Sequence, residues 1–420
     1  ASDSVCVTVN PVELSTPDEV LAFAQSVNSG NTYAGKTVVL SADIDLSTDS
    51  DTVSWSPIAG TFSGRFDGQG HTLSGIDINI SESTSSTVRA AFFSTLTEAT
   101  IENLVIEGSV SNTCSVSDSY TALLAAYSYG ATTIDNVVTH GTVTEASSER
   151  SGYIAGVLAY CYASTDNYAN FTNIGNEVNV NLASTADASS ESYAAGITGI
   201  ASFANFSSCY NKGNVYDTSE ETVSHSLYMG GISNATQACT FTSCYNTGTI
   251  HNAGTKSNYC ATSGIAGLLR TQCVFSNCYN TGDLYGAAGP VGPIDGTSYN
   301  GYIIDEGNNY YLTGKVSLGA GASLASSLGT AVNADYIGTS EFATVMGANY
   351  KLGPDTPMLV WEAETGNPVI AEQPNDVECM QNEEGIVLEV QASVPGGSFV
   401  GHDGSLSYQW YKQADRQAHV

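Results

Sequence analysis

The chain has 420 residues, with 11 Lys and Arg against 42 Asp and Glu and a formal net charge of −31. This excess of acid disfavours nucleic acid, anionic membranes and anionic polysaccharides as partners. No apolar run approaches the roughly 18 residues of a membrane span, so we expect no membrane insertion. The abundance of Ser, Thr, Asn and Gly and the 24 Tyr are typical of secreted β-rich proteins, which predicts an extracellular location.

The first predicted element is a helix within residues 12–30. The segment TPDE from Thr16 has the pattern of a capping box with proline at the first helical position. The apolar positions of the following VLAFAQSV give the helix one hydrophobic side. We expect this helix to cap the N-terminal end of a repeat array, because such arrays need a polar outer end.

The centre of the chain repeats itself. FSSCYNKGNV from Phe206, FTSCYNTGTI from Phe241 and FSNCYNTGDL from Phe275 are near copies, 35 and 34 residues apart. Weaker copies begin at Ile101, Ile134 and Phe171. The apolar positions follow period 2 and helical periodicity is absent, which predicts short strands with one coil per repeat. The expected fold is all-β, a right-handed parallel β-helix (solenoid) of about seven coils over residues 1–365.

The aligned positions explain most cysteines and asparagines. Cys209, Cys244 and Cys278 occupy one equivalent position and are interpreted as an inward ladder of small apolar side chains. A disulfide between Cys239 and Cys273 is the alternative for the second aligned pair, since one coil of separation suits its geometry. The asparagines that follow two residues later, at 211, 246 and 280, are expected to bond to one another along the axis.

These motifs resemble a known kind of repeat. The blocks YAGKTVVLSADIDL, FDGQGHTLSGI and AAFFSTLTEATIENLVIEG, together with the repeated CYNTG, are similar to GLUG-motif β-helix regions of surface proteins of Gram-positive, often gut, bacteria. The resemblance covers residues 12 to 365. It implies a secreted or wall-attached protein but no particular activity, because such repeats accompany peptidase, carbohydrate-active and adhesin-like modules.

The composition changes after the solenoid. Residues 366–376 are expected to be a linker, and residues 377–420 alternate like two β-strands, with Trp410 where an immunoglobulin-like domain places a core tryptophan. Only about half of such a sandwich is present. We therefore expect a partial immunoglobulin-like domain at the end of a piece of a longer multidomain chain.

Two surface features could carry function. Tyr210, Tyr245 and Tyr279 follow the aligned cysteines and should point outward, either as a flat aromatic strip for sugar rings or as a shield for the outer sheet. The variable loops leave one corner of the coil and carry acidic residues that include Glu149, Asp187 and Asp217. These acids form either a solvated rim or a site, in which case calcium or a catalytic carboxylate pair is the chemistry to test.

No standard catalytic or metal-binding motif occurs in the chain, so we expect no cofactor, with calcium alone left open. The leading hypothesis is a bacterial surface solenoid that acts as a binding or adhesion module for a cell-surface ligand, a neutral glycan above all. The alternatives are a glycoside hydrolase with paired Asp and Glu on the loop face, and a structural stalk.

Overall fold

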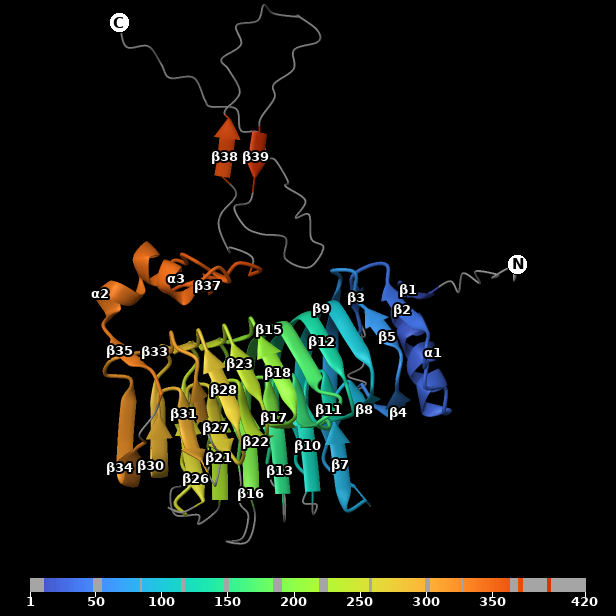
Figure 1. Ribbon diagram of the computed structural model, residues 1–420. Helices are drawn as coiled ribbons and strands as arrows, with labels where there is room; N and C mark the ends of the chain where they lie inside the picture. Colours follow the sequence, from blue (N-terminus) through green and yellow to red (C-terminus); the bar gives the residue numbers. More distant parts are fainter. Residues whose placement is uncertain are drawn as a thin grey trace, which may run out of the picture.

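In this computed structural model the described residues are 11–47, 55–83, 85–114, 118–146, 151–183, 191–218, 226–256, 259–298, 303–325, 328–362, 369–372 and 391–393. They form an elongated parallel β-solenoid, as predicted (Figure 1). One face is an eight-stranded sheet with one strand per coil. Its strands are β4 (Ile58–Phe62), β8 (Phe93–Thr97), β11 (Ala125–Tyr129), β14 (Leu158–Tyr162), β17 (Thr198–Ser202), β22 (Ser233–Gln237), β27 (Ala266–Leu269) and β31 (Asp295–Ser298).

The other strands of the coils belong to a second, 27-stranded sheet. Six coils contribute one short strand immediately before their strand of the eight-stranded sheet: β7 (Thr87–Ala90), β10 (Asp118–Ala122), β13 (Ser151–Ala155), β16 (Glu191–Ala195), β21 (Ser226–Gly230) and β26 (Cys260–Ser263). A longer stretch crosses the opposite wall as β9 (Thr100–Asn112), β12 (Thr133–Glu145) and β15 (Ala169–Leu182).

Later coils divide this stretch into β18 (Ala204–Ser207), β19 (Tyr210–Asn211), β20 (Val215–Asp217), β23 (Thr240–Thr242), β24 (Tyr245–Asn246), β25 (Ile250–Asn252), β28 (Cys273–Ser276), β29 (Tyr279–Asn280) and β30 (Leu284–Gly292). The array begins with β1 (Val12–Leu14), β2 (Thr37–Leu40), β3 (Ile44–Asp45), β5 (Arg65–Asp67) and β6 (Thr72–Ile80). It ends with β32 (Ile303–Asp305), β33 (Tyr310–Leu312), β34 (Val316–Leu324) and β35 (Thr330–Val332).

The strand register matches the sequence repeat. Phe206 pairs with Phe241 and Phe241 with Phe275, and the tyrosines that follow pair in the same order. The three phenylalanine rings stack inside the solenoid at centroid distances of 5.0 and 4.9 Å. The aligned repeats therefore place equivalent side chains directly above one another, as the alignment predicted.

The aligned cysteines lie in the same interior. Cys209, Cys244 and Cys278 are buried free thiols that belong to the main core. Cys239 and Cys273 are also buried and free, so the disulfide considered from the sequence is absent from this pair. Burial raises the pKa of the Cys273 thiol to about 11, so it remains protonated at neutral pH.

The asparagine ladder is present and is one coil longer than predicted. The side-chain amide of Asn176 donates to Asn211 at 2.7 Å, that of Asn211 to Asn246 at 2.7 Å, and that of Asn246 to Asn280 at 2.8 Å. Each donated bond satisfies a buried carbonyl in the next coil, so the ladder links the coils along the axis.

The turns after Asn246 and Asn280 require glycine. A Cβ atom on Gly248 would lie 2.0 Å from the carbonyl oxygen of Gly213, and one on Gly282 would lie 2.0 Å from that of Gly248. These coils can therefore stack at this corner only if the residue in the turn is glycine, which has no Cβ atom.

A helix and a folded-back segment flank the solenoid. Helix α1 (Pro17–Asn28) begins with the capping box at Thr16 and packs Phe23 against Phe62, with ring centroids 5.7 Å apart. It lies at the N-terminal end of the array (Figure 1). After the last coil the chain folds back as α2 (Ala334–Ile337), α3 (Ser340–Met346), β36 (Tyr350–Lys351) and β37 (Met358–Leu359). None of the helices in the described ranges is long and apolar enough to cross a membrane.

Beyond residue 362 the structure describes only two paired strands, β38 (Val369–Glu372) and β39 (Gln391–Ser393), which run antiparallel. Trp410 and most of the predicted immunoglobulin-like domain lie outside the described residues, as does most of the predicted linker. That part of the domain prediction therefore stays a prediction.

Candidate functional site: a covered tyrosine stack and an exposed tyrosine corner

The predicted aromatic strip exists but is not on the surface. Tyr210, Tyr245 and Tyr279 belong to a cluster separate from the main core, yet they are only 3%, 1% and 0% exposed. Their centroids are 5.5 and 4.8 Å apart, with interplanar angles of 17° and 4°. None of the three rings is open to solvent, so no aromatic surface for a sugar results. The prediction of a binding strip at these positions needs correction.

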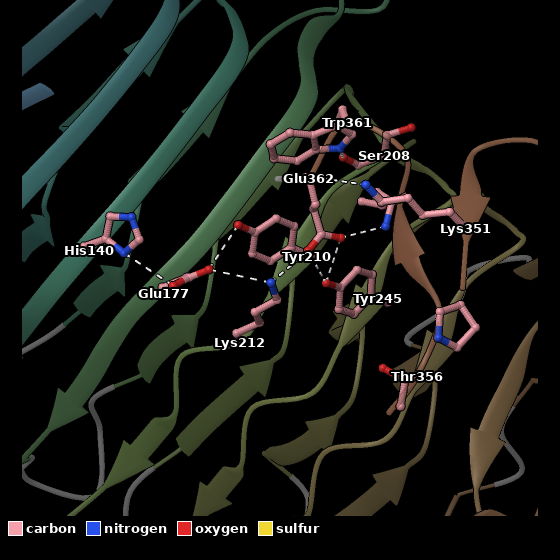
Figure 2. Close-up of polar contacts among 12 residues, drawn as sticks. His140, Glu177, Ser208, Tyr210, Lys212, Tyr245, Lys351, Thr356, Trp361 and Glu362 are labelled. Atoms are coloured by element: carbon pink, nitrogen blue, oxygen red, sulfur yellow. Dashed lines mark hydrogen bonds and ion pairs between the residues drawn. The ribbon is translucent and has the colours of Figure 1, made fainter. Parts of the chain in front are cut away.

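The fold-back segment, residues 334–362, covers this tyrosine stack. Trp361 stacks on Tyr210 at 5.4 Å and donates its indole N–H to the carbonyl of Ser208 at 2.9 Å (Figure 2). The hydroxyl of Tyr279 donates to the carbonyl of Pro357. The tyrosine stack is therefore the surface on which the fold-back segment packs.

One carboxylate fixes the segment in place. Glu362 is 2% exposed and accepts hydrogen bonds from the hydroxyl of Tyr245 at 2.8 Å and from the backbone N–H of Leu359 at 2.7 Å. The ammonium group of Lys212 lies 2.7 Å from the same carboxylate. Figure 2 shows these groups converging on Glu362 from the solenoid and from the segment. A buried carboxylate with this many donors is a structural anchor.

Charged residues of alternating sign continue along the solenoid beside this anchor. Lys212 also lies 3.6 Å from Glu177, whose other oxygen is 3.4 Å from Nδ1 of His140. The hydrogen bond from His140 holds the pKa of Glu177 below its usual value, and the same bond raises the pKa of His140. These residues line a cleft of about 780 Å³ whose opposite wall is the stretch from Leu352 to Met358.

The carboxyl group of Glu177 in this cleft does not suit the general acid of a glycoside hydrolase. A general acid at neutral pH needs a carboxyl group with a raised pKa, whereas the pKa of Glu177 is lowered. Burial does raise the pKa of Glu102 and Asp135, which are register partners on neighbouring coils. They do not line this cleft, and Glu102 forms an ion pair with Arg65.

A second group of tyrosines lies at the corner between β10, β13 and β16 and the eight-stranded sheet. Tyr120, Tyr153 and Tyr193 stack at 4.9 and 5.3 Å on one wall of the corner. Tyr127 and Tyr160 stack at 5.1 Å on the other wall. The two walls meet edge to face, with the rings of Tyr153 and Tyr160 5.0 Å apart and at 90°. Burial raises the pKa of Tyr160 to about 12, so these hydroxyls remain neutral donors.

Two further rings extend the corner into solvent. Tyr129 and Tyr162 lie two residues beyond Tyr127 and Tyr160 and are 52% and 40% exposed. Their centroids are 6.0 Å apart at 17°. Their outer register neighbours are Thr97 and Ser202, which are too small to cover a ring. Each of the two rings therefore keeps one face that its stacking partner does not cover.

Arginines lie beside the two walls of the corner. The guanidinium carbon of Arg89 is 5.1 Å from the ring of Tyr127 and 5.8 Å from that of Tyr120. Arg270 donates to the hydroxyl of Tyr193 at 3.3 Å, and that hydroxyl donates to Glu191 at 2.6 Å. Arg270 also lies 4.0 Å from the carboxylate of Glu191, whereas Arg89 is exposed and contacts the two rings.

The predicted acidic loop face is only partly described. Glu149 and Asp187 lie outside the described residues. Asp217 ends β20 and is 1% exposed, so it is not on an open rim. Among the residues that the structure describes, no group of three or more His, Cys, Asp and Glu is placed to hold a metal ion.

The sequence interpretation missed the exposed tyrosine pair and the covering segment. Tyr129 and Tyr162 carried a usable signal, because alternation places them on the same side as Tyr127 and Tyr160 and a 33-residue spacing stacks them. The segment from Ala334 to Glu362 carried none, since it has no counterpart among the repeats.

Comparison with known protein families and with curated proteins found no match. Among solved structures the chain is similar to one described as a "putative immunoglobulin A1 protease from Bacteroides ovatus". The identity is 17% and the TM-score 0.48, and the alignment covers 85% of this chain and 94% of that chain. A likeness at this level carries no argument about activity.

Proposed function

We propose that this solenoid is an extracellular bacterial surface module that binds a neutral glycan at the tyrosine corner. The observation that carries the proposal is the exposed, stacked pair Tyr129 and Tyr162. Sugar rings present flat patches of C–H groups that pack on aromatic faces, and this pair offers two such faces. Both rings are carried by the paired strands β11 and β14, whose backbone is already ordered, which lowers the entropic cost of binding.

The charge of the chain favours a neutral ligand. A formal charge of −31 repels acidic polysaccharides, and Arg270 next to the corner is already engaged by the Tyr193 hydroxyl and lies 4.0 Å from Glu191. The half-buried Thr97 lies in register beside Tyr129, and its hydroxyl group would complement a sugar hydroxyl. A binding module of this kind, carried on a longer surface chain, fits an adhesive role.

Neutral and acidic oligosaccharides on an array, probed with the full chain, test this proposal. We expect binding to a subset of neutral oligosaccharides, and loss of that binding in Tyr162→Ala with Tyr259→Ala as the control. Tyr259 is also exposed, at 45%, but lies outside the corner. Binding confined to acidic glycans would contradict the proposal, and a chain that binds no glycan at all would support the stalk.

The same oligosaccharides distinguish binding from hydrolysis. The hydrolase alternative needs a raised-pKa carboxyl group in a cleft, and the charged cleft holds Glu177 with a lowered pKa. We expect the bound oligosaccharides to be recovered intact, without release of reducing sugar. Release of reducing sugar would establish the hydrolase instead.

A further inference from the structure

The C-terminal end of the solenoid leaves one long strand with a free edge. Strand β34 pairs with β30 on one side, and no other strand in the described part of the chain pairs with it. It lies at the opposite end of the array from α1 (Figure 1). Leu318 and Leu324 of this strand are 46% and 62% exposed. By contrast, the strand at the N-terminal end, β1, has only three residues.

This edge lacks the charges and the proline that usually protect an edge strand against pairing. Natural edge strands carry charges or proline, or are very short, because their unpaired N–H and C=O groups attract another strand. Residues 316–334 contain no charged residue and no proline, although 13% of the chain is charged. Lys315, immediately before the strand, is held by Asp283 at 3.0 Å. The edge is therefore a neutral strip on a strongly acidic protein.

The sequence of β34 is self-complementary. VSLGAGASL reads nearly the same in both directions about Ala320. When two copies run antiparallel about that centre, Val316 faces Leu324, Ser317 faces Ser323, Leu318 faces Ala322, and the glycines face each other. In a two-fold interface, if one residue contacts a second residue of the other copy, that second residue contacts the first in return. A near-palindromic strand suits such an interface.

The local geometry divides the strand into two arms. The register between β30 and β34 shifts between Gly286 and Ala288, which places a bulge near the centre of β34. The arms on either side, 316–318 and 322–324, are the ones that face each other across the two-fold axis. The small residues between them let the two backbones approach at the bulge.

We propose that this edge pairs with a second copy of the chain, β34 against β34 in antiparallel orientation about Ala320. The two solenoids then share one continuous sheet end to end, which carries a glycan-binding corner on each copy. A second copy is the partner whose charge fits, because the rest of the surface repels and only the neutral strips can meet. Since each copy is strongly acidic, salt should strengthen the dimer by screening the repulsion.

Sedimentation velocity of the full chain at increasing concentration and ionic strength tests the pairing. We expect a monomer–dimer equilibrium that shifts toward the dimer as salt is raised. Ala320→Lys should abolish the dimer, because it places two ammonium groups at the axis, whereas Leu21→Lys on α1 should not. A chain that is monomeric in all conditions would overturn the proposal, as would a dimer that is insensitive to Ala320→Lys or a series of ever larger assemblies.

Disulfide cross-linking between single introduced cysteines locates the two-fold axis of the proposed dimer. The cysteines that the structure describes are buried, and Cys6 and Cys379, which lie outside the described residues, are replaced by serine in the background. Under mild oxidation Ala320→Cys should cross-link to itself. Ser317→Cys and Ser323→Cys should cross-link only when the two variants are mixed. Equal cross-linking of all three single variants would overturn the proposed register.

Discussion

Both carboxylate oxygens of Glu362 lie 2.8 Å from the hydroxyl of Tyr245, a residue 117 positions earlier in the chain. This contact fastens the fold-back segment onto the tyrosine stack. Removing the carboxylate in Glu362→Ala leaves the Tyr245 hydroxyl and the Lys212 ammonium without their buried acceptor. We expect the local opening free energy of the segment to fall by about 2 kcal/mol.

Hydrogen exchange measures this opening directly. A change of about 2 kcal/mol corresponds to roughly 30-fold faster exchange of the amides in α3 and β37. Glu341→Gln, a change of an exposed acid on α3, is the matched control and should leave exchange unaltered. Unchanged exchange in Glu362→Ala would show that the aromatic contacts alone hold the segment.

The asparagine ladder should contribute strongly to stability. Asn246→Ala removes the acceptor for the amide of Asn211 and the donor to Asn280, so buried polar groups lose their partners in two coils. We expect a loss of about 2–4 kcal/mol in the free energy of unfolding, measured by urea denaturation. Asn205→Ala is the control, because its amide bond to Asn170 is exposed, and it should cost less than about 1 kcal/mol. Equal losses in the two variants would contradict a special role for the buried ladder.

Glu145 should make the fold less stable as the pH rises. Burial raises the pKa of Glu145 from 4.5 to about 7, so between these values the folded chain holds a proton that the unfolded chain has released. The contribution of this group to the free energy of unfolding, about 3 kcal/mol, is fully present below about pH 4.5 and is lost as the pH rises through 7. Glu145→Gln should therefore stabilise the chain at pH 8 and change little at pH 4.

Glu177 should make the fold less stable as the pH falls, which is the opposite pH dependence to that of Glu145. The pKa of Glu177 is lowered, first by the hydrogen bond from His140, so its ionised form stabilises the fold and that stability is lost as the pH falls. Glu177→Gln should therefore destabilise the chain at pH 7 and have little effect in acid. Urea denaturation of both variants from pH 4 to 8 checks both predictions. Parallel pH profiles for the two variants would contradict the assignment.

The repeat register could be predicted because identical residues recur at a nearly constant spacing. Phe206, Phe241 and Phe275 stack where the alignment placed them, and so do the asparagines. Register also carried information that the sequence interpretation did not use. Glu145 pairs with Leu182, an apolar neighbour that marks an inward position, and Glu145 is fully buried.

The environment of the predicted binding tyrosines could not be predicted in the same way. Alternation places Tyr245 outside the main core, but it specifies neither the ring plane nor what covers it. The residues that cover it come from the later segment 334–362. The contacts of this segment, such as that of Trp361 with Tyr210, involve no repeated sequence and so could not be predicted by alignment. Local pattern fixes the side on which a residue lies, and only the complete chain fixes its exposure.

The proposed binding of a neutral glycan depends on the exposed pair Tyr129 and Tyr162. Titration calorimetry of the best neutral oligosaccharide against the double variant Tyr129→Ala/Tyr162→Ala tests it most directly. We expect the double variant to lose at least about tenfold in affinity, or about 1.4 kcal/mol, with its melting temperature within a few degrees of the parent because both rings are exposed. Unchanged affinity in a folded double variant would contradict a binding role for these two tyrosines.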